Sequence, residues 1–192
     1  MKKNLIYALL CAILSLNGCD KIKEVTSKDF TVNNINLDFT AVTENMPALS
    51  NSSADVSMRA AAAAMSTFSV TRTVDISELG SSELAEYASK ISKVVVNAAT
   101  VSVTTNPSGN YTVSNLKISA TGVSGSLEIP SYTIGSAFTA PSNMNSYLAN
   151  LLLKLTNDKK VTVTVSGQTD ALPGTTIKVS YESDVLFTAS LF

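Results

Sequence analysis

Four carboxylates lie close together in one short stretch of the chain, and their side chains could act as acids, bases or nucleophiles: Asp75, Glu78, Glu83 and Glu86. A carboxylate pair at a defined separation carries out glycoside hydrolysis, with one carboxyl as proton donor and the other as nucleophile or base. Glu83 and Glu86, however, lie three residues apart in a segment with helical spacing, which places them together on a solvent-facing side. Sugar-cleaving clefts also use aromatic platforms, and the chain has no Trp. The pattern therefore favours a solvated helix face over a catalytic pair.

The composition excludes several other chemistries. The 192 residues include no His, and 14 Lys and Arg stand against 15 Asp and Glu. Without imidazole there is no Ser–His or Cys–His nucleophile pair and no His metal ligand. The net charge of −1 argues against nucleic acid, which normally needs a basic face. We therefore expect a non-enzymatic protein with no catalytic residue, no metal, no cofactor and no nucleic-acid partner.

The remaining reactive group is the thiol of Cys19. Lys2 and Lys3 precede an apolar run from residue 5 to residue 16, which is the pattern of a secretory signal peptide. The run is shorter than the roughly 20 apolar residues that a transmembrane helix needs. The second cysteine, Cys11, lies within this run, so its removal with the signal peptide would leave Cys19 as the sole thiol.

The residues Leu16-Asn17-Gly18-Cys19 resemble the lipobox of bacterial lipoproteins, in which Asn17 is the unusual member. The resemblance implies cleavage between Gly18 and Cys19. It also implies that Cys19 carries diacylglycerol and a further acyl chain such as palmitate. Two alternatives remain: a secretory peptide in which Cys19 is incidental, and an uncleaved anchor. Asp20 resembles the inner-membrane retention signal of enterobacterial lipoproteins, but other phyla use different signals, which leaves inner and outer membrane open.

This resemblance predicts how the chain is divided and where in the cell it is located. We expect a signal peptide over residues 1–18, a lipidated cysteine and tether over 19–30, and a single β-rich domain over 31–192. The resemblance implies the lipoprotein-processing machinery as a partner and the membrane as the site of attachment. It places the domain in the bacterial cell envelope, in the periplasm or at the cell surface.

Alternation of apolar with Ser or Thr side chains predicts half-buried strands along most of this domain. Asn106-Pro107-Ser108-Gly109-Asn110 is a strong turn signal, so we expect the strands that flank it to form a hairpin. A slip near Asn115 indicates a bulge, and Pro130 is expected at an edge or a bend. Arg72 on an apolar face indicates that its strand also lies at an edge. The predicted strands cover residues 35–41, 67–74, 94–105, 111–120, 127–134, 161–165, 175–181 and 184–191.

Two segments have the spacing of amphipathic helices, residues 82–93 and residues 141–155. Ser81 or Ser82 is expected to cap the first. The second carries a continuous apolar stripe, formed by Met144, Tyr147, Leu148, Leu151, Leu152 and Leu155. One interpretation is that this stripe packs on a sheet as core. The other is that it lines a cavity for an acyl chain. Residues 44–65 are expected to form a loop with one helical turn.

Together these elements predict a mainly β (α+β) fold, a two-sheet antiparallel β-sandwich with two amphipathic helices. The mature domain resembles uncharacterised β-rich envelope lipoproteins, and no motif after Cys19 is specific to one family. The expected function is that of a lipid-anchored, non-enzymatic envelope module for binding, adhesion or structure, with a protein, glycan or lipid partner that the sequence does not identify. The alternative is an envelope carrier or chaperone for a hydrophobic ligand, which requires an internal cavity of several hundred Å³.

Overall fold

The computed structural model describes residues 26–46 and 65–191. The expected lipobox, Cys19 and Asp20 lie outside the described residues, and so does most of the 44–65 segment.

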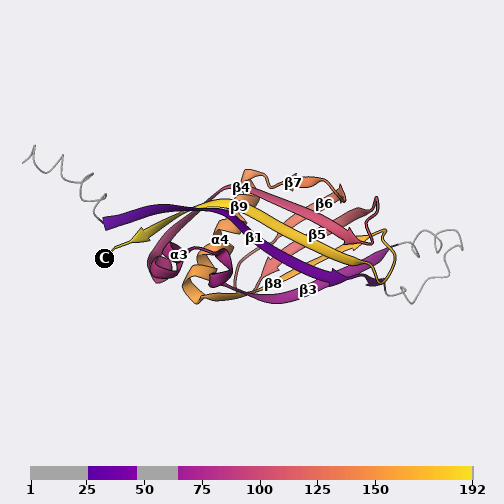
Figure 1. Cartoon of the computed structure of the whole chain (residues 1–192), viewed down its shortest axis with the longest axis horizontal. Helices are drawn as coiled ribbons and strands as arrows, with labels where there is room; N and C mark the ends of the chain where they lie inside the picture. Colours follow the sequence, from indigo (N-terminus) through magenta and orange to yellow (C-terminus); the bar gives the residue numbers. More distant parts are fainter. Residues whose placement is uncertain (1–25, 47–64, 192) are drawn as a thin grey trace, which may run out of the picture.

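Two antiparallel sheets pack face to face (Figure 1). One sheet has the order β1 (Ser27–Val42), β9 (Thr176–Ser190), β4 (Ile91–Asn106) and β7 (Ala137–Thr139). The other has the order β2 (Glu44–Asn45), β3 (Ser66–Asp75), β8 (Lys160–Thr169), β5 (Thr112–Ala120) and β6 (Leu127–Thr133). Apart from the short β2, this is the strand order of a jelly roll, in which the first strand lies beside the last. The predicted fold class is confirmed.

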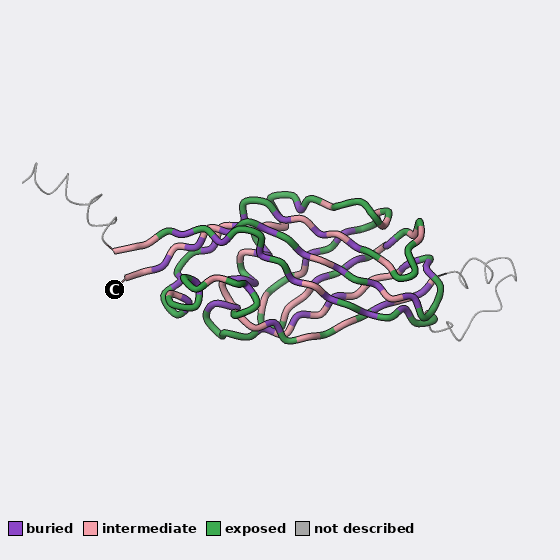
Figure 2. The backbone as a smooth tube through the Cα atoms, in the orientation of Figure 1, coloured by how far each residue is buried: buried purple, intermediate pink, exposed green. Residues whose placement is uncertain are grey.

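The alternation read from the sequence is the reason for the two layers. In β8 the side chains of Val161, Val163 and Val165 are buried between the sheets, while Thr162 and Thr164 lie on the outer face. The same alternation runs along the other long strands (Figure 2). Each sheet therefore turns one apolar face inward and one Ser- and Thr-rich face to solvent.

Helical segments occupy two of the connections. Between β3 and β4 lie η1 (Ile76–Leu79), α3 (Ser82–Tyr87) and η2 (Ala88–Lys90). The Ser81 hydroxyl caps α3 by accepting a hydrogen bond from the Leu84 amide at 3.2 Å, as expected. The predicted extension of this helix to residue 93 is wrong, because β4 begins at Ile91, which pairs with Ala189 of β9. The second predicted helix is present as α4 (Ser142–Asp158) and precedes β8, whereas the short β7 before it was not predicted.

The predicted hairpin around residues 106–110 is also wrong. β4 belongs to one sheet and β5 to the other, so the turn carries the chain across the sandwich. Alternation identifies the buried face of a strand but not its neighbours. β5 pairs with β6 on one side and, on the other, with β8, which follows some 40 residues later in the chain. The two predicted C-terminal strands are likewise a single strand, β9.

The three irregularities read from the sequence are confirmed. The pairing of β5 with β8 shifts between Ser114 and Lys117, and Asn115 has a φ of 52° within that bulge. Pro130 lies in β6, an edge strand. Arg72 lies in β3, which is covered by β2 only at residues 66 and 67.

Two predicted boundaries shift because backbone pairing continues through them. β1 begins at Ser27, so residues of the expected tether already pair with β9, with Phe30 opposite Phe187. β8 continues through Gly167, beyond the predicted end of this strand at residue 165. The ring of Phe68 on β3 lies directly over this glycine, where a Cβ would come within 2.6 Å of it. Among the described residues, no helix has the length and apolarity needed to cross a bilayer.

Candidate functional site

The apolar stripe of α4 is core. Tyr147, Leu148, Leu151, Leu152 and Leu155 are buried, and Met144 is partly buried against the same cluster. The stripe faces the inner sides of both sheets, where it meets Leu37 and Phe39 of β1, Ile118 of β5 and Val163 of β8.

The space beside this stripe is too small for a lipid. The void between α4 and the strands has a volume of about 20 Å³, close to that of a single water. Carriage of an acyl chain would need several hundred Å³. The described residues therefore form no cavity of the size that the carrier interpretation requires along the stripe from Met144 to Leu155, because the leucines fill the space that they would have to line.

The four acidic residues serve local structure. Asp75 caps η1: its Oδ1 accepts from the backbone N–H of Ser77 at 2.9 Å, and Glu78 Oε1 accepts from the Asp75 N–H at 2.9 Å. Glu83 pairs with Lys28 of β1 at 2.9 Å, and Glu86 is exposed on α3. No described cluster of three His, Cys, Asp or Glu side chains has the geometry of a metal site.

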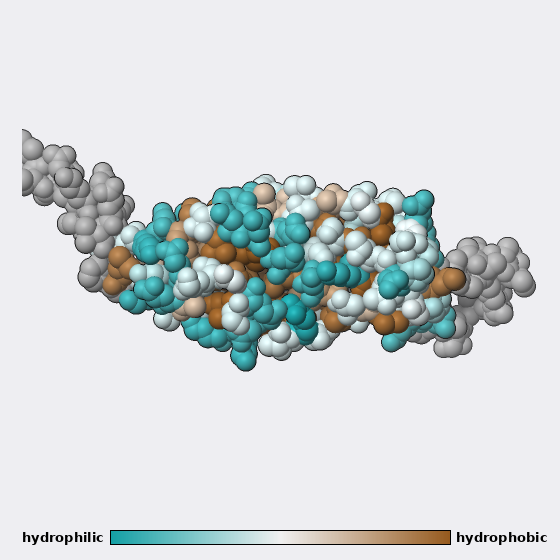
Figure 3. Space-filling model, viewed as in Figure 1, coloured by the Kyte–Doolittle hydropathy of each residue, from teal (hydrophilic) through white to brown (hydrophobic). Residues whose placement is uncertain are grey.

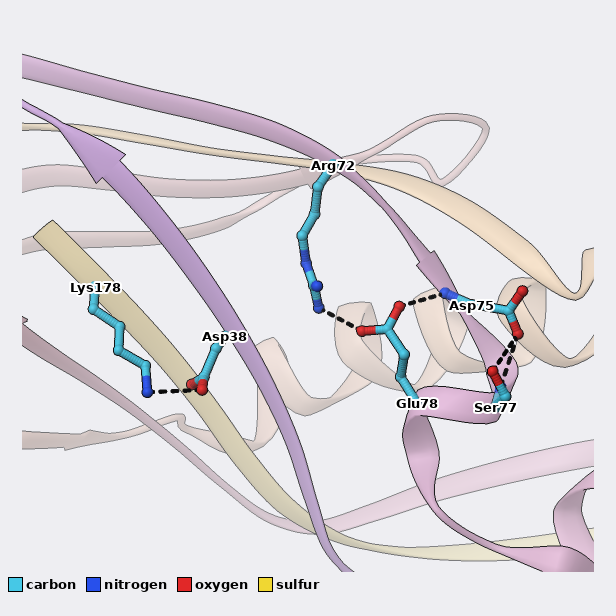
Figure 4. Close-up of polar contacts among 6 residues, drawn as sticks. All are labelled: Asp38, Arg72, Asp75, Ser77, Glu78 and Lys178. Carbon is cyan, nitrogen blue, oxygen red and sulfur yellow. Dashed lines mark hydrogen bonds and ion pairs between the residues drawn. The ribbon is translucent and has the colours of Figure 1, made fainter.

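Arg72 closes the seam between the two sheets (Figure 4). Its guanidinium lies 5.0 Å from the centroid of the Phe39 ring on β1, and its Nη2 donates to Glu78 Oε2 at 2.8 Å. On the outer face of β1, Asp38 pairs with Lys178 of β9 at 2.7 Å and accepts from the Ser180 hydroxyl. These contacts join four elements, β1, β3, β9 and η1.

The end of the sandwich opposite the helices presents an apolar tip, which we define as Val42, Leu172 and Pro173. Leu172 is 73% exposed and Val42 is 55% exposed, and these are the exposed large hydrophobic residues of the described chain. Figure 3 shows hydrophobic surface at this end, beside the grey atoms.

The loop that carries the apolar tip is fastened by hydrogen bonds. The Thr43 hydroxyl donates to the Leu172 carbonyl at 2.7 Å and accepts from the Thr175 N–H at 2.9 Å. The hydroxyl of Ser66, which is buried, donates to the Ala171 carbonyl at 2.7 Å. The exposed side chain of Leu172 is thus held on a fixed backbone.

An open hollow with a volume of about 440 Å³ lies on the outer face of β5 and β6, lined by Asn115, Lys117, Glu128, Ile129 and Pro130, and we call it the polar hollow after its two charged side chains. Lys117 and Glu128 form an ion pair across it at 3.1 Å. This pair and the Ser126 hydroxyl hold the pKa of the Glu128 carboxyl below its usual range, so the carboxylate stays charged.

Neither the apolar tip nor the polar hollow was predicted from the sequence. For the hollow, the available signal was the coincidence of an alternation slip at Asn115 with a proline in the next strand. For the tip, it was a Leu-Pro-Gly sequence at residues 172–174, a large apolar residue beside turn formers.

Comparisons with known proteins give structural matches only. No protein-family model matches the sequence, and no curated protein matches it. The decameric BFDV capsid protein is similar with a TM-score of 0.39 and 9% identity, over 83% of this chain and 99% of that one. Cocksfoot mottle virus has a TM-score of 0.39 and 11% identity over 85% of each chain. The Macrobrachium rosenbergii nodavirus particle has a TM-score of 0.35 and 9% identity, over 86% and 96%.

These matches give no support to the function expected from the sequence. A lipid-anchored envelope module for binding, adhesion or structure was expected, whereas the matched structures are described as a viral capsid protein and virus particles. The expected envelope function is corrected accordingly, and no viral role is assigned to this chain.

Proposed function

We propose that this protein is a non-catalytic structural jelly roll that works by self-association, with the apolar tip at the centre of the contact between copies. The observation that carries the proposal is the pair of exposed side chains, Leu172 on a loop held by hydrogen bonds and Val42 at the end of β1. A rigid apolar group loses little conformational entropy when a partner covers it. Its burial therefore contributes more to the free energy of association than the burial of a mobile group would.

The charge of the protein favours the same conclusion. Its net charge of −1 gives little long-range repulsion between copies. The outer faces of both sheets are rich in Ser and Thr, whereas the exposed large hydrophobic side chains of the described residues, Val42 and Leu172, lie at the tip. Contact between copies is therefore expected at the loop end, with hydrophobic burial at its centre and hydrogen bonds at its rim.

Sedimentation velocity of the full chain over a concentration series tests this proposal, in a non-ionic detergent that shields the apolar run at residues 5–16. We expect a reversible increase in sedimentation coefficient with concentration. Leu172→Asp should weaken the association at least about tenfold, because it places a charge in a desolvated contact.

The matched control is Asn150→Asp, which adds the same charge at an exposed position of α4, away from the tip. This variant should associate as the unmodified protein does. A protein that stays monomeric at all concentrations, or two variants that behave alike, would show that the tip does not mediate self-association.

A further inference from the structure

The polar hollow on the outer face of β5 and β6 exists because two irregularities meet there. The bulge at Asn115 interrupts the regular pairing of β5 on one side of the hollow. On the other side Pro130 has no backbone N–H to contribute to a ladder. The two strands are paired above and below this point, at Ser114 with Ser131 and at Leu116 with Ile129. The hollow is therefore held open by well-formed sheet on either side.

The side chains around the hollow combine donors with acceptors and have no net charge. The Asn115 amide is oriented by donating to Gln168 Oε1 at 3.1 Å, which leaves its carbonyl oxygen as an acceptor. Lys117 supplies a cationic donor and Glu128 an anionic acceptor, and their ion pair neutralises both. The exposed ring of Pro130 adds an apolar surface at the rim.

We propose that this hollow is a binding site for a neutral saccharide. Sugar hydroxyls each donate and accept hydrogen bonds, so they satisfy the amide, the ammonium and the carboxylate at once. The C–H face of a pyranose ring fits the apolar ring of Pro130. The volume of about 440 Å³ falls in the range of small-ligand sites, roughly 300–1,000 Å³.

The charge balance also selects against charged ligands. An anion would meet the Glu128 carboxylate, and a cation would meet the Lys117 ammonium, because both side chains line the hollow. A neutral ligand avoids both repulsions. The site is on the outer face of the sandwich and its residues do not belong to the apolar tip, so this inference stands independently of self-association.

The experiment is a ¹H–¹⁵N correlation spectrum of the full chain titrated with three neutral trisaccharides, cellotriose, maltotriose and xylotriose. We expect at least one of them to cause saturable shifts that cluster at Asn115, Lys117, Glu128 and Ile129. The absence of saturable shifts with all three, or shifts centred elsewhere on the protein, would overturn the proposal. Saturable binding of trigalacturonate but of none of the neutral sugars would overturn the ligand class.

Two variants test the residues. Asn115→Gly removes the amide and keeps the backbone conformation, since glycine adopts a φ near 52° without strain. Lys117→Gln with Glu128→Gln removes the ion pair at constant net charge. Each is expected to raise the dissociation constant at least tenfold, while the spectrum stays dispersed.

The matched control is Asp38→Asn with Lys178→Gln, which makes the same kind of change at an ion pair on the outer face of the other sheet. Its affinity for the sugar should equal that of the unmodified protein. An equal loss in this control would show that the effect comes from altered stability and not from the hollow.

Discussion

Arg72 illustrates how a single residue closes a sandwich that has open edges. Its side chain lies on the inward-facing side of β3, next to valines, yet its guanidinium reaches the aromatic ring of Phe39 and the carboxylate of Glu78. An inward-pointing charge at an edge also discourages another strand from pairing there. The residue therefore joins β1, β3 and η1 and protects the seam between them.

Replacement of Arg72 by Ala is predicted to destabilise the fold by about 1–2 kcal/mol, because it removes a cation–π contact, a partly buried ion pair and the packing of the alkyl stem. Urea unfolding followed by circular dichroism measures this change. Lys117→Ala, which breaks a more exposed ion pair, should change stability by less than about 0.5 kcal/mol. Equal effects of the two variants would contradict the role given to Arg72.

Asp75 gives the fold an acid-sensitive contact. The N–H and the hydroxyl of Ser77 bind its carboxylate, and with help from Lys160 they lower the pKa of Asp75 below its ordinary value of 3.8. A carboxyl whose pKa is lower in the folded state stabilises the fold above the unfolded pKa, and this contribution is lost as the pH falls through the folded pKa.

We therefore predict that stability falls as the pH drops below 3.8, and that Asp75→Asn makes this fall shallower. Asparagine can still accept from the Ser77 N–H but does not titrate in this range. Thermal unfolding between pH 7 and pH 2.5 compares the two proteins. A pH dependence that is identical in both would show that Asp75 does not contribute.

Acylation of Cys19 stays a prediction from the residues Leu16, Gly18 and Cys19. Metabolic labelling with palmitate in a bacterial host, followed by mass spectrometry of the N-terminal peptide, measures it. The label should be incorporated into the unmodified chain and lost in Cys19→Ser. Label that persists in this variant would exclude Cys19 as the acceptor.

At the scale of elements, α4 shows why an apolar helix face need not be a ligand site. The helix follows β7 and precedes β8 in the chain, and it packs against β4 of one sheet and β8 of the other. Leu152 and Leu155 are almost completely buried there. Its last residues are fixed by the Lys154–Asp158 ion pair at 2.6 Å and by Lys159 in the left-handed conformation. The leucines thus complete the hydrophobic core together with the inner faces of the two sheets.

Leu155→Ala is predicted to cost about 2–5 kcal/mol, since the surrounding strands cannot collapse into the space that it leaves. Met144→Ala, at the partly buried start of the same stripe, should cost clearly less. Chemical denaturation of both variants measures the difference. Comparable small losses in both would indicate a loosely packed helix and reopen the question of a cavity.

At the scale of the whole molecule, the jelly roll depends on contacts between its two ends. β9, near the C-terminus, lies between β1 and β4 and pairs with both along nearly its full length. Phe187 of β9 is completely buried and its ring stacks on Phe30 of β1, with 5.7 Å between centroids. The first and last strands must therefore meet before this sheet is complete.

Truncation after Tyr181 is predicted to abolish the folded state, because it leaves β1 and β4 without their shared partner over residues 27–36 and 91–100. Far-ultraviolet circular dichroism and the dispersion of the ¹H–¹⁵N spectrum measure this loss. A chain that begins at Thr26 keeps every described element and should retain both signals. A cooperative unfolding transition in the C-terminally truncated chain would show that β9 is dispensable.

The sequence by itself determined the properties that depend on neighbouring residues. The period-two pattern of β8, the apolar stripe of α4, the bulge at Asn115 and the edge position of Arg72 are all local signals, and each is present in the structure. These signals were enough to predict two antiparallel sheets and two helices, because the face that a residue buries follows from the geometry of its own strand or helix.

Only the tertiary structure decided which elements are partners and what space remains between them. That β4 and β5 belong to different sheets, that the α4 stripe leaves a void of only about 20 Å³, and that Leu172 stands out on a fixed loop all depend on residues far apart in the chain. The polar hollow belongs to the same class, since it forms where a bulge in one strand lies opposite a proline in the next. Periodicity reports burial, whereas partners and cavities follow from non-local packing, which a local pattern does not encode.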